Sequence, residues 1–363
     1  MIVADVLVLN VGSSTVKVQV VAPDGTRRLD EEVEGGPSDE VLGEVLDRAG
    51  AVDAVGHRIV HGGERHVGPE RVTDELLADL EQVAELAPLH LPPALHVVRA
   101  VQRLRPDLPS VACFDTAFHA TLPAAARTEA VPAEWADQGL RRYGFHGLSH
   151  AYVARRVAEL LGRPVGELRT VSCHLGAGAS MAAIDGGRSV DTTMGFSPLS
   201  GLVMATRPGD LDVGAVLWLL RRGLTPDEVE DALWHRSGLA GLSGRSGDMR
   251  DLLAGVDDGD EACGLAYATY LHRARAAIAG MVAAMGGVDV VAFTGGVGER
   301  SARVRADIVV GLGILEVDLG VEPDIRDGQV VDAVVSTADS GTAVAVVHAR
   351  EDEEMARQVR TVL

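Results

Sequence analysis

The sequence predicts an α/β protein made of two related halves, and three observations support this prediction. A strand, a tight polar turn and a second strand open the chain, and the same pattern returns near residue 170, about half the chain later. Segments with strand-like and helix-like apolar spacing alternate along most of the 363 residues. The chain is 47% hydrophobic, which allows a full core in each half. We therefore expect two duplicated domains with mixed sheets and a cleft between them.

The first half begins with the two strands and their polar turn. Apolar residues fill positions 6–9, and valines alternate with polar residues over 16–20, as in a half-buried strand. Thr73 is a plausible N-cap for a helix, and Pro88 is expected to end that helix. The remaining predicted elements of this half are helices over 38–49 and 94–104 and strands over 52–60 and 110–114.

The second half repeats the opening pattern in TVSCHLGAGASMAAIDGG, which starts at Thr170. Its turn at 174–178 stands 164 positions after the turn that starts at residue 10. Further along, the apolar spacing predicts helices over 213–222, 226–234 and 262–284, a strand over 288–293 and a helix from about Ser301. A late strand over 330–335 and a final helix over 340–349, rich in small residues, complete the predicted order.

Charge and composition exclude several classes of function. The formal net charge is −20, so the chain as a whole repels nucleic acid, and an anionic substrate would need positive groups placed locally. The three cysteines are far apart and form no metal-type pair, which fits a reducing compartment. The start of the chain has no basic region before its apolar run, and no apolar stretch is long enough to span a membrane. We therefore expect a cytoplasmic protein without nucleic-acid or membrane partners.

Three glycine-rich turns each follow a predicted strand, at 10–15, 174–180 and 294–299. Such turns expose backbone N–H groups and let phosphate oxygens approach the main chain closely. The third turn also precedes a helix, whose N-terminus favours anions. The chain contains neither GxxxxGK[ST] nor a spaced GxGxxG. The three turns together predict a triphosphate held between two lobes, with Lys17 within reach of a phosphate.

Eight segments, in order along the chain, resemble the signature motifs of acetate kinases. They are NVGSSTVK at 10–17, GHRIVHGGE at 56–64, CFDTAFH at 113–119, RRYGFHGLSH at 141–150, CHLGAGAS at 173–180, SPLSGLVMATRPGDLD at 197–212, SGLAGLSGRSGDMRDL at 237–252 and FTGGVGE at 293–299. The resemblance implies two duplicated ribonuclease-H-like domains of the actin, hexokinase and Hsp70 type, with a central nucleotide cleft. The implied domains are 1–145 with about 340–363, and 146–339.

The resemblance further implies the reaction, which is reversible, in-line transfer of a phosphoryl group from ATP to acetate. The implied cofactors are ATP and Mg²⁺, with Mn²⁺ as a substitute, and the implied assembly is a homodimer to which the helix over 262–284 contributes. Two alternatives remain open at this stage. One is a kinase for propionate, butyrate or a similar short acid, and the other is a non-catalytic nucleotide-binding protein on the same fold.

Residue by residue, the resemblance assigns four catalytic positions: Arg58, Asp115, His146 and Arg207. The implied nucleotide and phosphate contacts are Asn10, Gly12, Ser13, Ser14, Thr15, Lys17, His174, Leu175, Gly176, Ala177, Gly178, Asp248, Met249, Arg250, Gly295, Gly296, Val297 and Gly298. The implied apolar pocket for the acid consists of Val60, Leu89, Phe145 and Pro198. Asn10 and Asp339 are the implied metal ligands. His57, His61 and His119 are interpreted as structural.

The chain also departs from the motifs of the family it resembles. Ala177 stands where acetate kinases usually have asparagine, and Arg300 replaces the asparagine expected after GVGE. Asp339 is the expected counterpart of a metal-associated glutamate and is one methylene shorter. These departures concern the nucleotide side of the predicted site, whereas Arg58, Asp115, His146, Arg207 and Lys17 are all present.

Overall fold

The computed structural model describes residues 4–12, 15–34, 38–88, 90–320, 322, 325–326 and 329–363. By packing, the chain divides into two compact units. The first unit contains Met1–Ala120, Phe145–Tyr152 and Arg350–Leu363, and the second contains Thr121–Gly144 and Val153–Ala349. The domain boundaries expected from the sequence, at 145/146 and near 340, remain a prediction, and the packing assigns 121–144 to the second unit.

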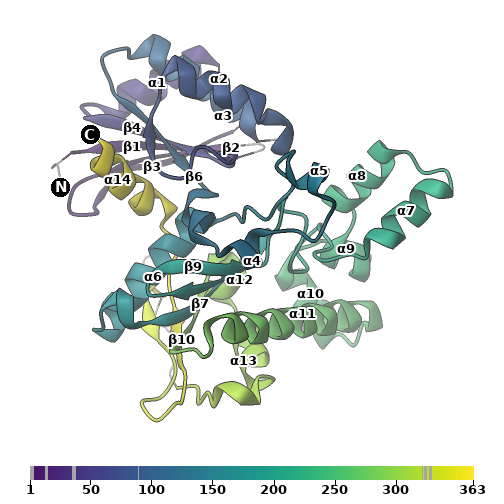
Figure 1. Ribbon diagram of the computed structural model, residues 1–363. Coiled ribbons are helices and arrows are strands. Elements are labelled where there is room, and N and C mark those ends of the chain that lie inside the picture. The colour runs from purple at the N-terminus through teal and green to yellow at the C-terminus, as the bar shows by residue number, and fades with distance from the viewer. Residues whose placement is uncertain are drawn as a thin grey trace. The chain divides into compact units, whose positions relative to one another are not determined.

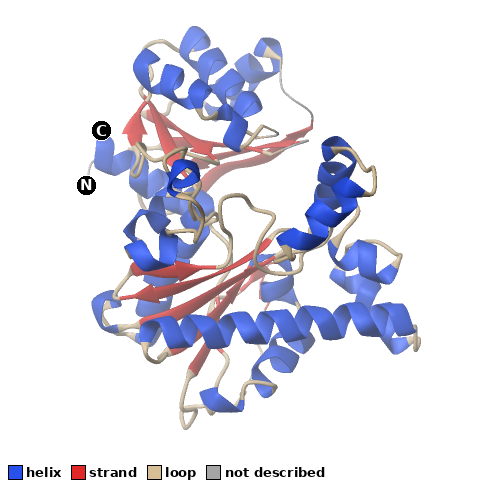
Figure 2. Ribbon diagram, turned by 45° about the vertical axis from the view of Figure 1, so that its right-hand side comes forward, coloured by secondary structure: helices blue, strands red, loops and turns tan. Residues whose placement is uncertain are grey.

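The first unit is built on a six-stranded mixed sheet, drawn in red in Figure 2. Its strands are β1 (Val6–Val11), β2 (Thr15–Val21), β3 (Arg27–Glu34), β4 (Ala54–Ile59), β5 (Glu70–Arg71) and β6 (Ser110–Phe114). They lie in the order β3-β2-β1-β4-β6-β5. Strands β1, β4 and β6 are parallel neighbours, and the other pairings are antiparallel. The parallel strands are buried because helices cover both faces of the sheet.

The helices of the first unit lie on the two faces of this sheet (Figure 1). They are α1 (Asp39–Ala49), α2 (Asp74–Gln82), η1 (Ala84–Leu86), α3 (Leu91–Leu104) and α14 (Glu351–Val362), joined by the start of α6. Thr73 caps α2 as predicted, accepting a hydrogen bond from the Leu76 amide. Helix α14 packs so closely on β4 that a Cβ at Gly56 would lie 2.9 Å from Val359. Met355 and Val359 of α14 belong to the same core cluster as Val6 and Val8.

The second unit repeats this topology, which confirms the predicted duplication. Its sheet contains β7 (Arg169–Leu175), β8 (Ala179–Asp185), β9 (Arg188–Thr192), β10 (Val290–Thr294), β13 (Ala333–Val334) and β14 (Ala343–Val346). Read as β9-β8-β7-β10-β14-β13, the order matches β3-β2-β1-β4-β6-β5 strand for strand. The matching strands also have the same directions, because β7, β10 and β14 are parallel and the other pairs are antiparallel.

Helices and short connections complete the second unit. They are η2 (Ala117–Thr121, which begins in the first unit), α4 (Ala124–Arg127), α5 (Ala133–Ala136), α6 (Gly147–Leu161), η3 (Val165–Glu167), α7 (Val213–Arg221), α8 (Pro226–His235), α9 (Gly238–Ser243), α10 (Met249–Asp257), α11 (Glu261–Met285), α12 (Gly295–Arg300), α13 (Ala302–Val310), η4 (Gly313–Leu315) and the hairpin β11 (Ile325–Arg326) and β12 (Gln329–Val330). The long helix α11 lies along the sheet (Figure 2). Among the described residues, no helix combines the length and apolar character needed to cross a membrane.

The helix predicted over 340–349 is wrong. Residues Ala343–Val346 form strand β14, which pairs in parallel with β10, and the last helix begins at Glu351. The alternating alanines and valines of β14 are almost entirely buried in the sheet, where pairing outweighs the small residues' helical preference. The acidic run Glu351–Glu354 instead starts α14, where negative charge is favourable at a helix N-terminus.

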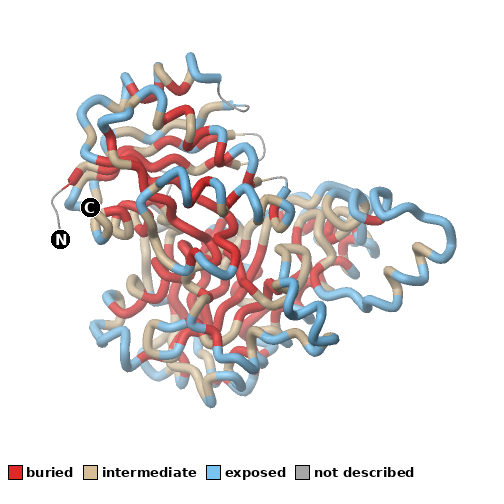
Figure 3. The backbone as a smooth tube through the Cα atoms, turned by 45° about the horizontal axis from the view of Figure 1, so that its top comes forward, coloured by how far each residue is buried: buried red, intermediate tan, exposed pale blue. Residues whose placement is uncertain are grey.

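Buried histidines in the first unit give a prediction about stability. His119 is 2% exposed within the buried regions shown in red in Figure 3, and its Nε2 donates to the Phe145 carbonyl at 3.0 Å. Burial lowers the pKa of His119 to about 4. Because an unfolded histidine has a pKa of about 6.5, the unfolded chain binds the extra proton as the pH falls below that value. Stability is therefore lost progressively from about pH 6.5 toward pH 4.

We expect His119→Gln to reduce this acid sensitivity, because the glutamine amide keeps a donor without a titrating ring. Between pH 7.5 and pH 5, the wild type should lose about 2 kcal/mol more unfolding free energy than the variant. Urea denaturation at both pH values measures the difference. His235→Gln is the matched control at an exposed histidine and should follow the wild type. Parallel pH profiles for wild type and His119→Gln would contradict the prediction.

Candidate functional site

The first unit brings polar side chains together at the carboxyl ends of three adjacent parallel strands. Asn10 is near the end of β1, Arg58 is near the end of β4, and Asp115 directly follows β6. Because β1, β4 and β6 are parallel neighbours, their carboxyl ends meet at one edge of the sheet. Open α/β sheets bind ligands at this edge. The topology therefore explains why residues 48 and 57 positions apart in the sequence are in contact.

Arg58 is held in one orientation by its neighbours. Its Nε and Nη2 donate to the two carboxylate oxygens of Asp115 at 3.0 and 2.5 Å, and its Nη1 donates to Asn10 Oδ1 at 3.0 Å. A carboxylate oxygen of Glu351 lies 3.9 Å from Nε. Burial alone would lower the pKa of Arg58, but Asp115 and Glu351 outweigh it and raise the pKa. Burial raises the pKa of Asp115 against the opposing effect of Arg58. The guanidinium is thus permanently charged and fixed.

Glu351 belongs to this cluster and was missed by the sequence reasoning. It is the first residue of α14, and the only local signal is an acidic run after a buried strand. The sequence reasoning named Asp339 as a metal ligand instead. Asp339 is exposed in a turn of the second unit, and it forms no hydrogen bond or ion pair with any residue that the structure describes.

The oxygen atoms of Asn10, Asp115 and Glu351 are of the kind that Mg²⁺ prefers. Within the described part of the chain, no group of three His, Cys, Asp or Glu residues could hold a metal ion by itself. Two carboxylates and an amide oxygen fit an ion that completes its shell with phosphate oxygens and water, as Mg²⁺ usually does in nucleotide sites. The residues present in the first unit therefore fit a nucleotide-bound divalent cation.

His146 directly precedes α6 in a strained conformation beside Asp115. Its φ of 56° lies in the left-handed region, which non-glycine residues rarely adopt. The next amide, of Gly147, donates to the Asp115 carbonyl at 2.9 Å. A Cβ at position 147 would lie only 2.2 Å from that carbonyl oxygen, so glycine is required there. This close packing fixes His146 next to the Asp115 backbone. Strained residues of this kind are concentrated at functional sites.

The first glycine-rich turn and the predicted acid pocket are only partly described. The Gly12 amide donates to the Thr15 carbonyl at 2.7 Å, which closes the turn. Lys17 is exposed and pairs with Asn10 across β1 and β2, so the two side chains share one face. In the predicted acid pocket, Val60 and Phe145 are both buried in the first unit. Ser13, Ser14 and Leu89 lie outside the described residues.

In the second unit, the other two glycine-rich turns lie side by side. They follow β7 and β10, which are parallel neighbours with His174 opposite Thr294. Gly295 has a φ of 78°, and a Cβ there would lie 2.8 Å from the Leu175 carbonyl oxygen. A Cβ at Gly176 would lie 3.9 Å from the Gly296 amide nitrogen. The two turns therefore pack backbone to backbone, which requires glycine and exposes their N–H groups at one place.

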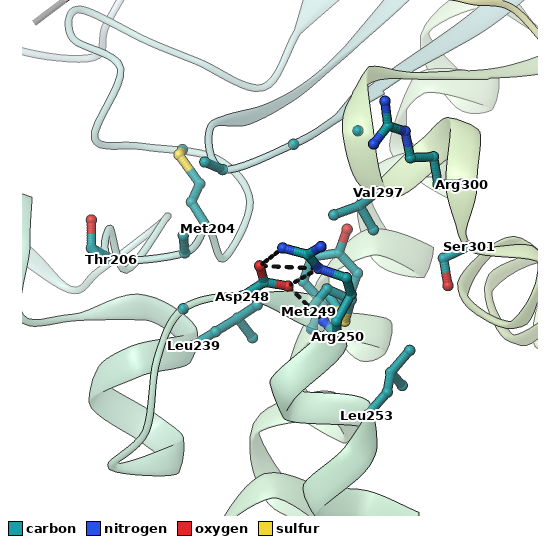
Figure 4. Close-up of a pocket in the computed structure, with 16 residues that line it drawn as sticks. Met204, Thr206, Leu239, Asp248, Met249, Arg250, Leu253, Val297, Arg300 and Ser301 are labelled. Carbon is teal, nitrogen blue, oxygen red and sulfur yellow. Dashed lines mark hydrogen bonds and ion pairs between the residues drawn. The ribbon is translucent and has the colours of Figure 1, made fainter. Parts of the chain in front are cut away.

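A cavity of about 590 Å³ opens beside these two turns. Figure 4 shows its sixteen lining residues. Those assigned from the sequence are Gly176, Ala177, Asp248, Met249, Arg250, Gly296 and Val297. Those not assigned are Met204, Ala205, Thr206, Leu239, Gly247, Leu253, Tyr270, Arg300 and Ser301. His174, Leu175, Gly178, Gly295 and Gly298 shape the turns rather than the wall.

The charged residues of the cavity wall are unequally paired. Asp248 caps α10 and binds the Arg250 guanidinium through both carboxylate oxygens (Figure 4). The hydrogen bonds from Arg250 lower the pKa of Asp248 to about 2, so both groups are charged and compensate each other. Arg300 is exposed on the wall, and no described residue pairs with it. The mostly apolar wall with one uncompensated cation suits a nucleotide, with a flat apolar base and an anionic chain.

Arg207 differs from Arg58 because it lacks an acidic partner. It lies in the second unit, where its Nη1 donates to the Pro198 carbonyl at 2.9 Å. Its guanidinium carbon lies 5.7 Å from the centroid of the Trp234 ring. Burial lowers the pKa of Arg207, and within the part of the chain that the structure describes no carboxylate forms an ion pair with it. A half-buried guanidinium without a carboxylate favours binding of an anion.

The comparisons with known proteins agree on one family. A sequence profile of the acetokinase family matches residues 38–357. An acetate kinase from Gloeobacter violaceus is 47% identical over 309 residues, covering 85% of this chain and 76% of that protein. The crystal structure of an acetate kinase from Porphyromonas gingivalis matches with a TM-score of 0.90 and 34% identity over 99% of both chains. A propionate kinase from Francisella tularensis matches with a TM-score of 0.89 and 29% identity, over 99% of this chain and 100% of that one. The chain therefore belongs to the acetokinase family.

Proposed function

We propose that this protein transfers the γ-phosphoryl group of ATP to acetate, giving ADP and acetyl phosphate, and catalyses the reverse reaction. The observation that supports this most strongly is the fixed Arg58 cluster at the sheet edge, with His146 beside it. Arg207 supplies a second guanidinium, without a carboxylate partner among the described residues. These groups suit a reaction between two anions, a carboxylate and a polyphosphate.

The chemistry requires charge compensation and alignment rather than a general base. A carboxylic acid is already ionised near neutral pH, so acetate is itself the nucleophile. Direct transfer forms the bond between an acetate oxygen and phosphorus and breaks the bond between phosphorus and the oxygen bridging to ADP. In this proposal Arg58, Arg207 and His146 stabilise the equatorial oxygens of the transferring group. A divalent cation, which we propose to be Mg²⁺ with Mn²⁺ as a substitute, would be held by Asn10, Asp115 and Glu351 and would neutralise phosphate charge.

The nucleotide site is assigned to the cavity of the second unit. Val297 and the backbone of Gly296 and Gly298 would pack against the base and ribose, with Asp248 and Arg250 contacting the adenosine. The N–H groups of the turns after β7 and β10 would bind phosphate oxygens. Ala177 cannot donate through its side chain, whereas the nearby Arg300 provides a positive charge on the same wall.

The identity of the acid rests on a small apolar pocket that includes Val60, Phe145 and Pro198. Such a pocket distinguishes acids that differ by one methylene only by about 10-fold to 200-fold. Acetate is therefore the proposed main substrate, and propionate is the proposed second one, in line with the propionate kinase among the structural relatives. Butyrate should be a poorer substrate than either.

Trapping acyl phosphate with hydroxylamine tests the proposal directly. Purified protein, ATP, Mg²⁺ and each acid from formate to butyrate should give an acyl hydroxamate, with the highest kcat/KM for acetate. A higher kcat/KM for propionate would identify the alternative short-acid kinase. ATP binding, measured by calorimetry, without product from any acid would instead support a non-catalytic nucleotide-binding protein and would overturn the proposed reaction.

We also propose that the protein acts in the cytoplasm. Its three cysteines are buried free thiols, which fits a reducing compartment. ATP as a substrate fits the same compartment.

The proposed homodimer gives a testable prediction about α7. None of its residues is buried, although its sequence is VGAVLWLLR, and Val213, Leu217 and Trp218 are 76, 50 and 55% exposed. The α7–α8 hairpin is mostly pale blue or tan in Figure 3, whereas α11 packs on the sheet. An exposed apolar helix is expected to bind a partner, and we propose that a second copy covers it.

Light scattering should give the mass of two chains for the wild type and of one chain for Trp218→Glu, because a buried unpaired carboxylate disrupts an apolar interface. Trp135→Glu is the matched control, since Trp135 is also about half exposed, at 51%, but lies on α5. A Trp218→Glu variant that remains a dimer would remove α7 from the interface.

A further inference from the structure

A buried carboxylate behind the nucleotide cavity holds two chain segments together. Glu299 is 5% exposed and lies in α12. Its Oε1 accepts hydrogen bonds from the Gly295 and Ala349 amides, both at 2.9 Å. Its Oε2 lies 2.6 Å from His348 Nδ1. Burial would raise the pKa of Glu299, but the bonds from His348 and the two amides outweigh it and lower the pKa.

The two segments have different places in the molecule. Residues 295–301 form the glycine-rich turn and include Gly296, Val297, Arg300 and Ser301 of the cavity wall. Residues 348–349 are the last of the second unit, because the chain enters the first unit at Arg350. Only two residues separate Ala349 from Glu351, which belongs to the Arg58 cluster. Glu299 is thus bonded both to the nucleotide turn and to the chain that leads to the candidate metal ligand.

A second carboxylate strengthens this connection. Asp332 accepts a hydrogen bond from the His348 amide at 2.7 Å and one from Arg156 Nε at 2.6 Å. Arg156 lies on α6, three residues after the chain has crossed back into the second unit at Val153. Two of the segments that join the units are therefore anchored to one buried hydrogen-bond network, Glu299–His348–Asp332–Arg156. A fully bonded buried network of this kind is rigid.

We propose that Glu299 is a positioning residue that makes the position of residues 348–351 depend on the state of the nucleotide turn. It touches neither substrate nor metal in this proposal. It acts through the two amides that share Oε1, so that nucleotide bound at the turn fixes the start of α14. The inference deepens the proposed function, on which it rests for the nature of the nucleotide.

The geometry allows a sharp test, because one oxygen accepts both amide bonds. Glu299→Gln can place its carbonyl oxygen at the Oε1 position and keep both bonds without the charge. Glu299→Ala removes both bonds, and Glu299→Asp keeps the charge but is one methylene shorter. We therefore expect kcat for the glutamine variant within about 3-fold of wild type, and for the alanine and aspartate variants at least about 10-fold lower, corresponding to roughly 1.4 kcal/mol.

Amide hydrogen exchange supplies a readout that does not require turnover. In the wild type, ADP should slow exchange in peptides covering both 294–301 and 347–351. In Glu299→Asp and Glu299→Ala, ADP should still protect 294–301 but no longer 347–351, and Glu299→Gln should restore protection of both. If Glu299→Ala does not fold, Glu299→Asp tests the same point.

Three results would overturn the inference. They are protection of 347–351 that persists in Glu299→Asp, absence of that protection in the wild type, and a glutamine variant as impaired in kcat as the aspartate variant. The last result would show that the charge, not the shared acceptor, is important. If the wild type lacked acid-dependent turnover but showed the expected exchange pattern, the proposed reaction would fail while the positioning role of Glu299 stood.

Discussion

Replacing Arg58 with glutamine is expected to lower kcat/KM for acetate by about 10³-fold, because an arginine on a transferring phosphoryl group contributes at least that much. This loss corresponds to about 4 kcal/mol of transition-state stabilisation. Both edges of the guanidinium are already fixed by Asp115 and Asn10, so the reaction does not have to order it. The hydroxamate assay measures the rate, and calorimetry should show that ATP still binds to the cavity of the second unit.

The main complication is that Arg58→Gln leaves Asp115 buried without its cation. Breaking a buried pair in this way costs about 3–5 kcal/mol, so the single variant can lose activity by unfolding. The double variant Arg58→Gln/Asp115→Asn removes both charges and should recover most of the melting temperature but none of the activity. Arg65→Gln, at an exposed arginine of the same unit, is the control. A double variant that is both stable and active within 10-fold of wild type would contradict the assigned role.

The sequence was most informative where a function depends on local backbone shape. The glycine-rich turns after β1, β7 and β10 were predictable because glycine is required at positions such as Gly295, with its positive φ. The duplication was predictable from the first two turns, and the matching strand orders confirm it. Strand β3 was not predicted, because its charged sequence RRLDEEVE lacks the apolar alternation of a half-buried strand. It forms nevertheless because β2 offers it a pairing edge.

The sequence was least informative where contacts are distant along the chain. Glu351 meets Arg58 only because α14 returns to the first unit after the second unit is complete. No local pattern marks that return, and the misread segment 340–349 hid it. Likewise, Arg300 could be named as a departure from a motif, but its position on the cavity wall follows from α12 and its neighbours. Whether an arginine is paired depends on folding, so the contrast between Arg58 and Arg207 also required the structure.

Replacing Arg207 with glutamine should also lower kcat/KM by about 10²-fold to 10³-fold, but with a different thermodynamic signature. Because no described carboxylate pairs with Arg207, its removal leaves no buried acid uncompensated. It relieves the burial of a cation whose pKa is lowered by that burial. The melting temperature should therefore stay within about 3 °C of wild type or rise, since only the Pro198 bond and the Trp234 contact are lost.

The matched control is Arg303→Gln, because the Arg303 guanidinium also lies 5.7 Å from an aromatic ring, that of Tyr267. Arg303 pairs with Asp257 and lies away from the cavity wall, so its loss should leave kcat/KM nearly unchanged. Arg207→Lys separates charge from geometry, since lysine keeps the charge but cannot form two parallel bonds to a phosphate. If Arg207 contributes a forked contact in the transition state, lysine will restore little of kcat. Full activity in Arg207→Gln, or a large loss of stability with a normal rate in the protein that remains folded, would show that Arg207 has a structural role.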